Sequence, residues 1–383
     1  MPALAQSFAG HGAPTAKLFA PLQCGPLALP NRLAVAPMTR VSATAQGLPT
    51  ARMADYYRGF AQGGFGLVIT EGLYTDQEYS QGYLFQPGLA TDAHGQAWRS
   101  VVAGVQAHGA RMVAQLMHAG ALSQGNPHRS GTRGPSATRP KGEQMRFYRG
   151  TGPYAMPEAM STQEISRAVA GFARAATHAR QAGFDGVEIH GANGYLLDQF
   201  LSEGINLRQD GYGGSVEARL HLMAEIVAAV REAVGNEFAI GLRISQAKVN
   251  DFAHKWRGGE DEAATIFGAL GRLPIDYLHT TEYEAWRPAF DAGPSLAALA
   301  KRYAAVPVLA NGSLHDPAQA AGLLERGEAD AVSLGRGALT HPDWPRRVRD
   351  GAPLETFDAG ILSPIADLEN AERHRAGTAP VGG

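Results

Sequence analysis

Short apolar runs recur along the chain, and most are followed by a stretch with helical periodicity. Eight runs are too continuous in hydrophobicity to be half-exposed strands, which is typical of parallel strands covered on both faces. They are Leu33–Pro37, Gly66–Thr70, Met112–Met117, Gly186–His190, Ala239–Ile244, Tyr277–Thr280, Val306–Ala310 and Ala331–Leu334. The alternating amphipathic stretches are Arg52–Gln62, Gln96–His108, Thr162–Ala182, Val216–Val234, Glu260–Leu270, Ser295–Tyr303 and Pro317–Arg326. This alternation predicts an α/β fold, a single (β/α)8 TIM-type barrel.

The rival arrangement is a doubly wound sheet, whose dinucleotide fingerprint is missing. The nearest approach is Gly335-Arg336-Gly337, which follows the last strand and lacks both the third glycine and a following βαβ unit. The barrel is therefore the better prediction.

One long interruption, Ala119–Met160, separates the third strand from its helix. An irregular stretch of that length inside a compact domain is usually functional or mobile. At the C-terminal mouth of a barrel it would form a lid. We expect residues 18–368 to form one barrel, with a flexible arm at 1–17 and a frayed tail at 369–383.

Composition narrows the possible partners. The 383 residues include 34 basic and 36 acidic side chains, a formal charge of −2, which favours neither nucleic acid nor an acidic membrane surface. The single cysteine, Cys24, rules out an intramolecular disulfide and indicates a reducing compartment. Met1–Lys17 lacks the basic region of a signal peptide, and no run approaches about 20 apolar residues. A cytoplasmic protein, monomeric or homo-oligomeric and without membrane contact, is expected.

The C-terminal ends of barrel strands carry the active site in this fold, and here they carry polar residues. The last two ends, Asn311-Gly312-Ser313 and Gly335-Arg336, offer bare backbone N–H groups and one guanidinium. Loops after strands seven and eight commonly bind phosphate in this way. Two plain glycine turns are the alternative reading.

The fourth strand end is the richest in chemistry. His190 ends the strand, and Asn193 and Tyr195 follow closely. Two neighbouring donors suit a substrate oxygen that gains negative charge, and a phenol beside them can deliver a proton. A zinc site would need further ligands, for which the strand-end candidates are His118 and His279.

With these residues in hand, the sequence resembles the Old Yellow Enzyme family of FMN-containing ene-reductases, from about Leu18 to Asp367. The most specific pieces are HGANGYLLDQFL from His190 to Leu201 and N-x-R-x-D-x-YGGS-x-E-x-R from Asn206 to Arg219. Leu29-Pro-Asn-Arg32, the Pro-Met-Thr of the first strand and Gly335-Arg336 agree with it.

The resemblance implies roles for individual residues. Pro37, Met38, Thr39 and Gly72 would line the isoalloxazine ring, and Gln115 and Arg243 would bind its pyrimidine side, where a cation raises the flavin potential. The phosphate would be held by Asn311, Gly312, Ser313, Gly335 and Arg336. FMN fits better than FAD, since no adenine-binding fold is present. No metal is expected.

The implied reaction has two halves. NADPH or NADH reduces the flavin and leaves, and an electron-poor alkene then stacks on the same ring face. His190 and Asn193 would bind its carbonyl or nitro oxygen while hydride passes to the β-carbon and Tyr195 protonates the α-carbon. Stabilisation of the developing negative charge is usually the largest catalytic term.

The chain departs from the family pattern in places. Thr39 stands where some relatives carry cysteine, and Ala121 stands where many carry arginine, which predicts a more open third strand end. Lys248–Glu260 does not match the pattern. Glu282, Tyr283 and Trp286 follow strand six and either shape the substrate pocket or serve ordinary loop packing.

Three other functions remain open at this point. An FMN-linked dehydrogenase or demethylase of N-methylated amines would use the same barrel oxidatively. A non-catalytic flavin-binding barrel would need no proton donor, and a metal-dependent barrel hydrolase would carry zinc. The complete set of His190, Asn193 and Tyr195 favours alkene reduction.

Overall fold

Eight parallel strands close into a barrel in the computed structural model, which describes residues 15–377. They are β3 (Leu33–Val35), β4 (Leu67–Ile69), β6 (Arg111–Met117), β9 (Gly186–Asn193), β10 (Ala239–Lys248), β11 (Tyr277–Thr281), β12 (Val308–Asn311) and β13 (Ala331–Leu334). Their order is β4-β3-β13-β12-β11-β10-β9-β6, and pairing of β4 with β6 closes the ring. The predicted (β/α)8 barrel is confirmed. Each strand overlaps an expected run, and β9, β10, β11 and β12 extend past the predicted ends.

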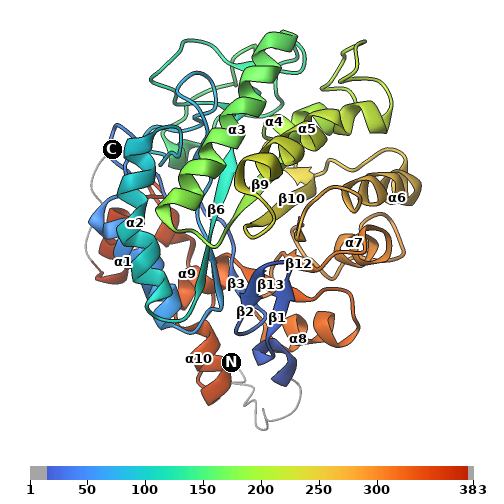
Figure 1. Cartoon of the computed structure of the whole chain (residues 1–383). Helices are drawn as coiled ribbons and strands as arrows, with labels where there is room; N and C mark the ends of the chain where they lie inside the picture. Colours follow the sequence, from blue (N-terminus) through green and yellow to red (C-terminus); the bar gives the residue numbers. More distant parts are fainter. Residues whose placement is uncertain (1–14, 378–383) are drawn as a thin grey trace, which may run out of the picture.

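A ring of helices covers the outside of the strands (Figure 1). It consists of α1 (Ala51–Gln62), α2 (Asp92–Gln106), α3 (Thr162–Ala182), α5 (Val216–Val234), α6 (Gly259–Leu270), α7 (Leu296–Ala304) and α8 (Pro317–Glu325). Helix α2 begins four residues before the expected Gln96, because the Thr91 hydroxyl accepts a hydrogen bond from the backbone N–H of His94 and caps the helix there. Helix α3 begins with a complete capping box between Ser161 and Glu164.

An antiparallel hairpin that the sequence did not predict lies at one end of the barrel. Its strands are β1 (Leu22–Cys24) and β2 (Leu27–Leu29). Cys24, Leu27 and Leu29 pack in one apolar cluster with barrel residues such as Leu67 and Val113. Burial raises the pKa of the Cys24 thiol to about 12, so the side chain stays a neutral part of this cluster.

The C-terminal region is more regular than expected. Helices α9 (Arg336–Thr340) and α10 (Trp344–Asp350) follow the last strand, and Leu368–Arg375 form α11, where the sequence indicated a frayed tail from 369. Arg52 on α1 forms ion pairs with Glu369 and Glu372, which holds α11 against the barrel. Residues 1–14 of the expected arm and 378–383 of the tail lie outside the described residues.

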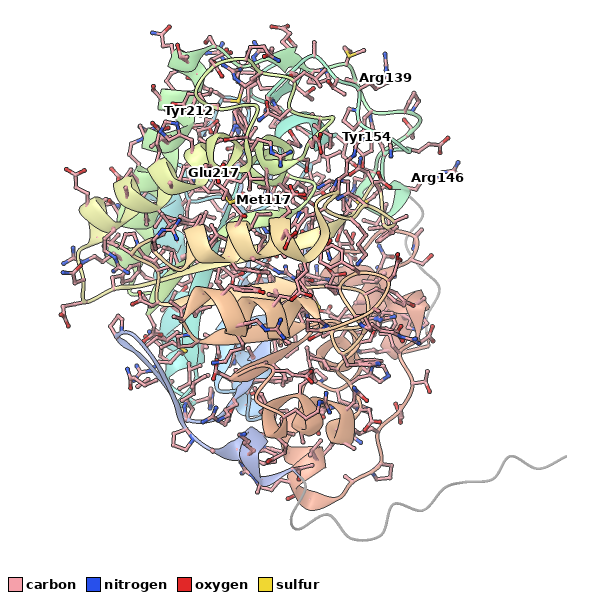
Figure 2. The ribbon with its side chains drawn as sticks, turned by 90° about the vertical axis from the view of Figure 1, so that its right-hand side faces the viewer. Met117, Arg139, Arg146, Tyr154, Tyr212 and Glu217 are labelled. Carbon is pink, nitrogen blue, oxygen red and sulfur yellow. The ribbon has the colours of Figure 1, made fainter. Side chains whose placement is uncertain are left out.

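The Ala119–Met160 excursion carries only short elements: η2 (Gly120–Leu122), β7 (Arg133–Gly134), η3 (Arg146–Tyr148) and β8 (Glu158–Ala159). In Figure 2, Arg139, Arg146 and Tyr154 of this excursion lie near one edge of the molecule, and Met117 lies deeper. The Tyr148 hydroxyl donates to the backbone oxygen of Thr39 at 3.1 Å, so the excursion covers the end of the first barrel strand as a lid would.

Over residues 15–377, no helix is both long and apolar enough to cross a membrane.

Candidate active site

The turn after β9 brings together the predicted His190, Asn193 and Tyr195. Asn193 adopts a left-handed backbone (φ 62°), and its N–H donates to the Ser245 hydroxyl at 2.8 Å. The next N–H, of Gly194, donates to the Asp198 carboxylate at the start of α4 (Leu196–Leu201). These bonds hold an unfavourable backbone in place, which is common where a turn aims functional side chains.

Tyr195 is a protonated phenol in a nearly dry environment. It is 6% exposed, and burial raises its pKa to about 12, although the hydrogen bond to the Tyr83 hydroxyl lowers it. The two hydroxyl groups lie 2.5 Å apart. A phenol that keeps its proton at neutral pH can act as an acid but not as a base.

His190 is positioned as a neutral hydrogen-bonding group. Its ring centre lies 5.1 Å from that of Tyr195, and burial, Arg243 and His279 lower its pKa well below the ordinary value. Its Nδ1 is buried and has no hydrogen-bond partner within 15–377, and no bond there engages the Asn193 amide. Two polar side chains therefore remain free for a ligand.

Arg243 and Gln115 lie on neighbouring parts of the barrel interior, and both are almost fully buried. The Arg243 Nη2 donates to the Thr281 hydroxyl at 3.2 Å and to Asn311 Oδ1 at 3.0 Å. The Nε of Arg243 has no partner among the described residues. An orphaned buried guanidinium N–H fits an acceptor supplied by a bound ligand, as expected of the pyrimidine edge of a flavin.

The Asn311 side chain is engaged within the protein. Its Oδ1 accepts from Arg243 and from Thr281 (2.7 Å), while its Nδ2 donates to the backbone oxygen of Ser333 at 2.9 Å. Both ends of the side chain are therefore committed to the barrel interior. Any contribution of Asn311 to a phosphate site has to come from its backbone.

The other predicted phosphate residues form a cradle. Ser313, Gly335 and Arg336 line one small cavity, and Arg336 donates a hydrogen bond to the Ser313 hydroxyl. Gly312 has a φ of 144°, and a Cβ there would lie 2.4 Å from the backbone oxygen of Glu282. Only glycine fits this position, which is the kind of close approach that phosphate loops require.

The residues expected around the flavin ring flank the same region. Pro37, Met38 and Thr39 are half-buried at the end of β3, so they retain surface for a ligand. Gly72 is buried, and a Cβ there would lie 2.4 Å from the sulfur of Met117. The donors, the cradle and this apolar edge together fit a flavin mononucleotide.

A cavity of about 670 Å³ opens beside Asn193. Glu282 and Tyr283 line it, as the sequence suggested, whereas Trp286 packs against the main core. The unmatched Lys248–Glu260 loop forms the opposite wall through Val249, Phe252 and Lys255. Lys255 and Glu282, both in the lining, form an ion pair at 3.3 Å.

Ala121 does not leave an opening. Its side chain is 3% exposed, its backbone N–H donates to Gln199, and Gly134 of the excursion packs over it. The expectation of a more open third strand end is wrong, because the excursion fills the space that a longer side chain would take.

A model of the NADH:flavin oxidoreductase / NADH oxidase family matches residues 17–355. The chain belongs to this family. It is 36% identical over 347 residues to a probable flavin mononucleotide-dependent alkene reductase of Leishmania infantum, covering 88% of this chain and 92% of that protein. The fold, the enzyme class and the Old Yellow Enzyme resemblance are thereby confirmed.

Solved structures of the family share its architecture. A morphinone reductase in complex with tetrahydroNAD has a TM-score of 0.81 and 33% identity, covering 93% of this chain and 96% of its own. An Old Yellow Enzyme homologue from Zymomonas mobilis has a TM-score of 0.81 and 31% identity, covering 92% and 99% respectively.

Three groups in this Old Yellow Enzyme family site were missed from the sequence. Tyr83 reaches Tyr195 from a loop with no periodic signal. Lys248, at the end of β10, forms a buried ion pair with Asp198. Glu188 lies within β9, and a carboxylate in an otherwise apolar strand was a signal that could have identified it. Over residues 15–377, no cluster of three potential metal ligands is present.

Proposed function

We propose that this flavin oxidoreductase is an FMN-dependent ene-reductase that uses NADPH or NADH to reduce electron-poor alkenes conjugated to a carbonyl or nitro group. The observation that supports it is the protonated Tyr195 phenol beside the unpartnered His190 and Asn193. When bound, FMN would supply hydride transfer from NAD(P)H to the β-carbon of the alkene.

His190 and Asn193 bind the substrate oxygen in this proposal. Because His190 is neutral, it donates one hydrogen bond without placing a full charge next to Arg243. The Asn193 amide donates the second. Both donors gain strength as negative charge develops on the oxygen, and loss of one such donor is expected to cost about 10²–10³ in rate.

Tyr195 delivers its proton to the α-carbon. Its hydroxyl is held by the hydroxyl of Tyr83, whose burial raises its own pKa well above the ordinary value. Neither phenol is a good anion in this environment, so the proton is released only to a strongly basic carbon. The bulk of Tyr83, Tyr148 and Tyr154 around Tyr195 excludes water from this transfer.

The proposed cofactor contacts follow the residues that fit it. Arg243 and Gln115 would bind the pyrimidine edge, Pro37, Met38, Thr39 and Gly72 would line the ring, and Gly312, Ser313, Gly335 and Arg336 would hold the phosphate. The Asn311 backbone completes that loop. The cavity beside Asn193 would admit the small-molecule alkene.

The test is the visible spectrum of the purified protein under anaerobic conditions, before and after addition of NADPH. Flavin bands that bleach with NADPH and recover with 2-cyclohexenone support both half-reactions. A yellow protein that NADPH and NADH fail to bleach, but that an N-methylated amine bleaches, would replace the proposal with the oxidative reading. A yellow protein that nothing bleaches would indicate flavin binding without catalysis.

A further inference from the structure

A buried carboxylate lies beneath the proposed flavin site and has no part in the reaction as proposed. Glu188 on β9 is 0% exposed. Its Oε1 accepts from the Gln115 amide at 2.8 Å, and its Oε2 accepts from His279 Nδ1 at 2.8 Å and from the Tyr277 hydroxyl at 3.2 Å. Three donors from two other strands, Gln115 on β6 and both Tyr277 and His279 on β11, therefore converge on one carboxylate.

These bonds determine the orientation of the neighbouring groups. An ionised carboxylate only accepts, so Gln115 must direct its NH₂ group to Glu188, which leaves its carbonyl oxygen free. His279 must likewise donate from Nδ1, and its Nε2 then accepts from the Ser333 hydroxyl at 2.7 Å. Glu188 thus determines which way the Gln115 amide is oriented, with its NH₂ group toward the carboxylate.

Glu188 also places a negative charge near Arg243. In the pairing of β9 with β10, Glu188 lies opposite Gly241, two positions before Arg243, so the two buried side chains share one face of the sheet. Burial alone would raise the pKa of Glu188, but His279 and Arg243 hold it below the ordinary value. Burial lowers the pKa of His279, so the pair carries one negative charge, on Glu188. A buried guanidinium such as Arg243 is costly without a counter-charge, and this carboxylate provides one.

We propose that Glu188 is a positioning residue that sets both the orientation of Gln115 and the reduction potential of the bound cofactor. The inference rests on the proposed FMN site. A flavin gains negative charge on reduction, and Arg243 stabilises that charge. The negative charge of Glu188 near Arg243 opposes the addition of a second negative charge there, so it makes the cofactor harder to reduce. In this proposal, the hydrogen bond from Gln115 to Glu188 sets the orientation of the Gln115 amide, and the negative charge of Glu188 lowers the reduction potential of the flavin.

The charge is tested with Glu188→Gln, which keeps the shape of the side chain. The protein is reconstituted with FMN, and its potential is measured against a reference dye. We expect the equilibrium constant for flavin reduction to rise about tenfold, or about 30 mV for a two-electron couple. Ser333→Ala is the matched control, because it removes the hydrogen bond between the Ser333 hydroxyl and His279, at the far end of the same hydrogen-bond network, without changing charge. An unchanged potential in E188Q, or an equal shift in S333A, overturns the proposal.

Glu188→Asp tests the positioning of Gln115 separately from the charge, and it also tests the proposal if E188Q does not fold. It keeps the negative charge but withdraws the carboxylate from Gln115. The dissociation constant of FMN is expected to rise by up to about tenfold, because a misoriented Gln115 amide loses one neutral hydrogen bond to the flavin. An unchanged constant overturns the positioning role. Failure of the wild-type protein to bind FMN would instead refute the proposed function.

Discussion

At the scale of single residues, the site is organised by what surrounds each functional group. Burial raises the pKa of Tyr195 and lowers the pKa of His190. Both side chains are therefore held in their neutral forms. The neutral phenol of Tyr195 can give up a proton, and the neutral imidazole of His190 can donate a hydrogen bond. The environment thus divides two roles between groups whose ring centres lie 5.1 Å apart.

Tyr195→Phe is expected to slow alkene reduction about 10²-fold or more, the usual contribution of a positioned general acid. Reduction of the flavin by NADPH should be unaffected, because it requires no proton from this side chain. Stopped-flow measurement of the two half-reactions tests this, with Tyr79→Phe on an outer loop as the matched control. Equal losses in both half-reactions would contradict the proton-donor role.

Arg336→Ala is expected to weaken FMN binding about 10- to 100-fold, since a hydrogen bond to a charged group contributes roughly 1.5–3 kcal/mol. Arg336 also lies over the Tyr283 ring at 5.3 Å, so its guanidinium is held in the cradle before the ligand arrives. FMN retention is measured by equilibrium dialysis. Arg326→Ala, which removes an exposed arginine paired with Glu328, should leave retention unchanged. Full retention in R336A would place the phosphate elsewhere.

At the scale of elements, the sequence predicted the eight strands because each is a short apolar run between turn residues. It could not predict where β10 ends. Polar Ser245, Gln246 and Lys248 interrupt the apolar pattern, yet all three are buried, because their partners come from distant segments. Pairing between segments far apart in the chain has no local signal, which is also why Tyr83 was not identified. Helix α11 was missed because its apolar face is small.

The Lys248–Asp198 pair connects the end of β10 with α4. Its N–O distance is 2.6 Å, and the side chains are 1% and 0% exposed. Lys248→Met is expected to lower the free energy of unfolding by about 3–5 kcal/mol, since it leaves a buried carboxylate unpaired. Urea denaturation measures this. Lys255→Met removes a half-exposed ion pair and should cost less than about 1 kcal/mol.

Adding Asp198→Asn to K248M should restore much of the lost stability, because no uncompensated charge then remains. It should not restore alkene reduction fully, since Asp198 also accepts from the Gly194 N–H in the turn that carries Asn193 and Tyr195. A double variant as unstable as K248M alone would show that the pair contributes through packing and not through charge.

At the scale of the whole molecule, the barrel interior combines an apolar base with a polar mouth. The β1–β2 hairpin covers one end with apolar side chains, while Arg243, His190 and His279 lie toward the strand ends that carry the candidate site. The lid and the Lys248–Glu260 loop meet over that site, where Lys141 pairs with Asp251 at 2.7 Å. Burial of so many titratable groups makes the stability of the folded chain depend on pH.

Five buried histidines among the described residues predict the direction of that dependence. Burial is the largest cause that lowers the pKa values of His94, His118, His190, His279 and His341. The unfolded chain therefore binds protons below about pH 6.5 that the folded chain does not, and stability is lost as pH falls through that range. Glu71 and Glu282 act in the opposite direction, because burial raises the pKa of Glu71 to about 7 and also raises that of Glu282, so the folded chain takes up these protons first.

The five histidines outweigh the two carboxyls, and we expect the free energy of unfolding to fall by about 3 kcal/mol between pH 7.5 and pH 5.5. Urea denaturation at pH 7.5, 6.5 and 5.5 measures the slope. His94→Gln, remote from the candidate site, should reduce the slope by about one histidine's share while leaving the FMN spectrum unchanged. A stability that is constant across this window would mean that the histidines titrate in the folded protein, which would also remove the basis for a neutral His190 in the proposed mechanism.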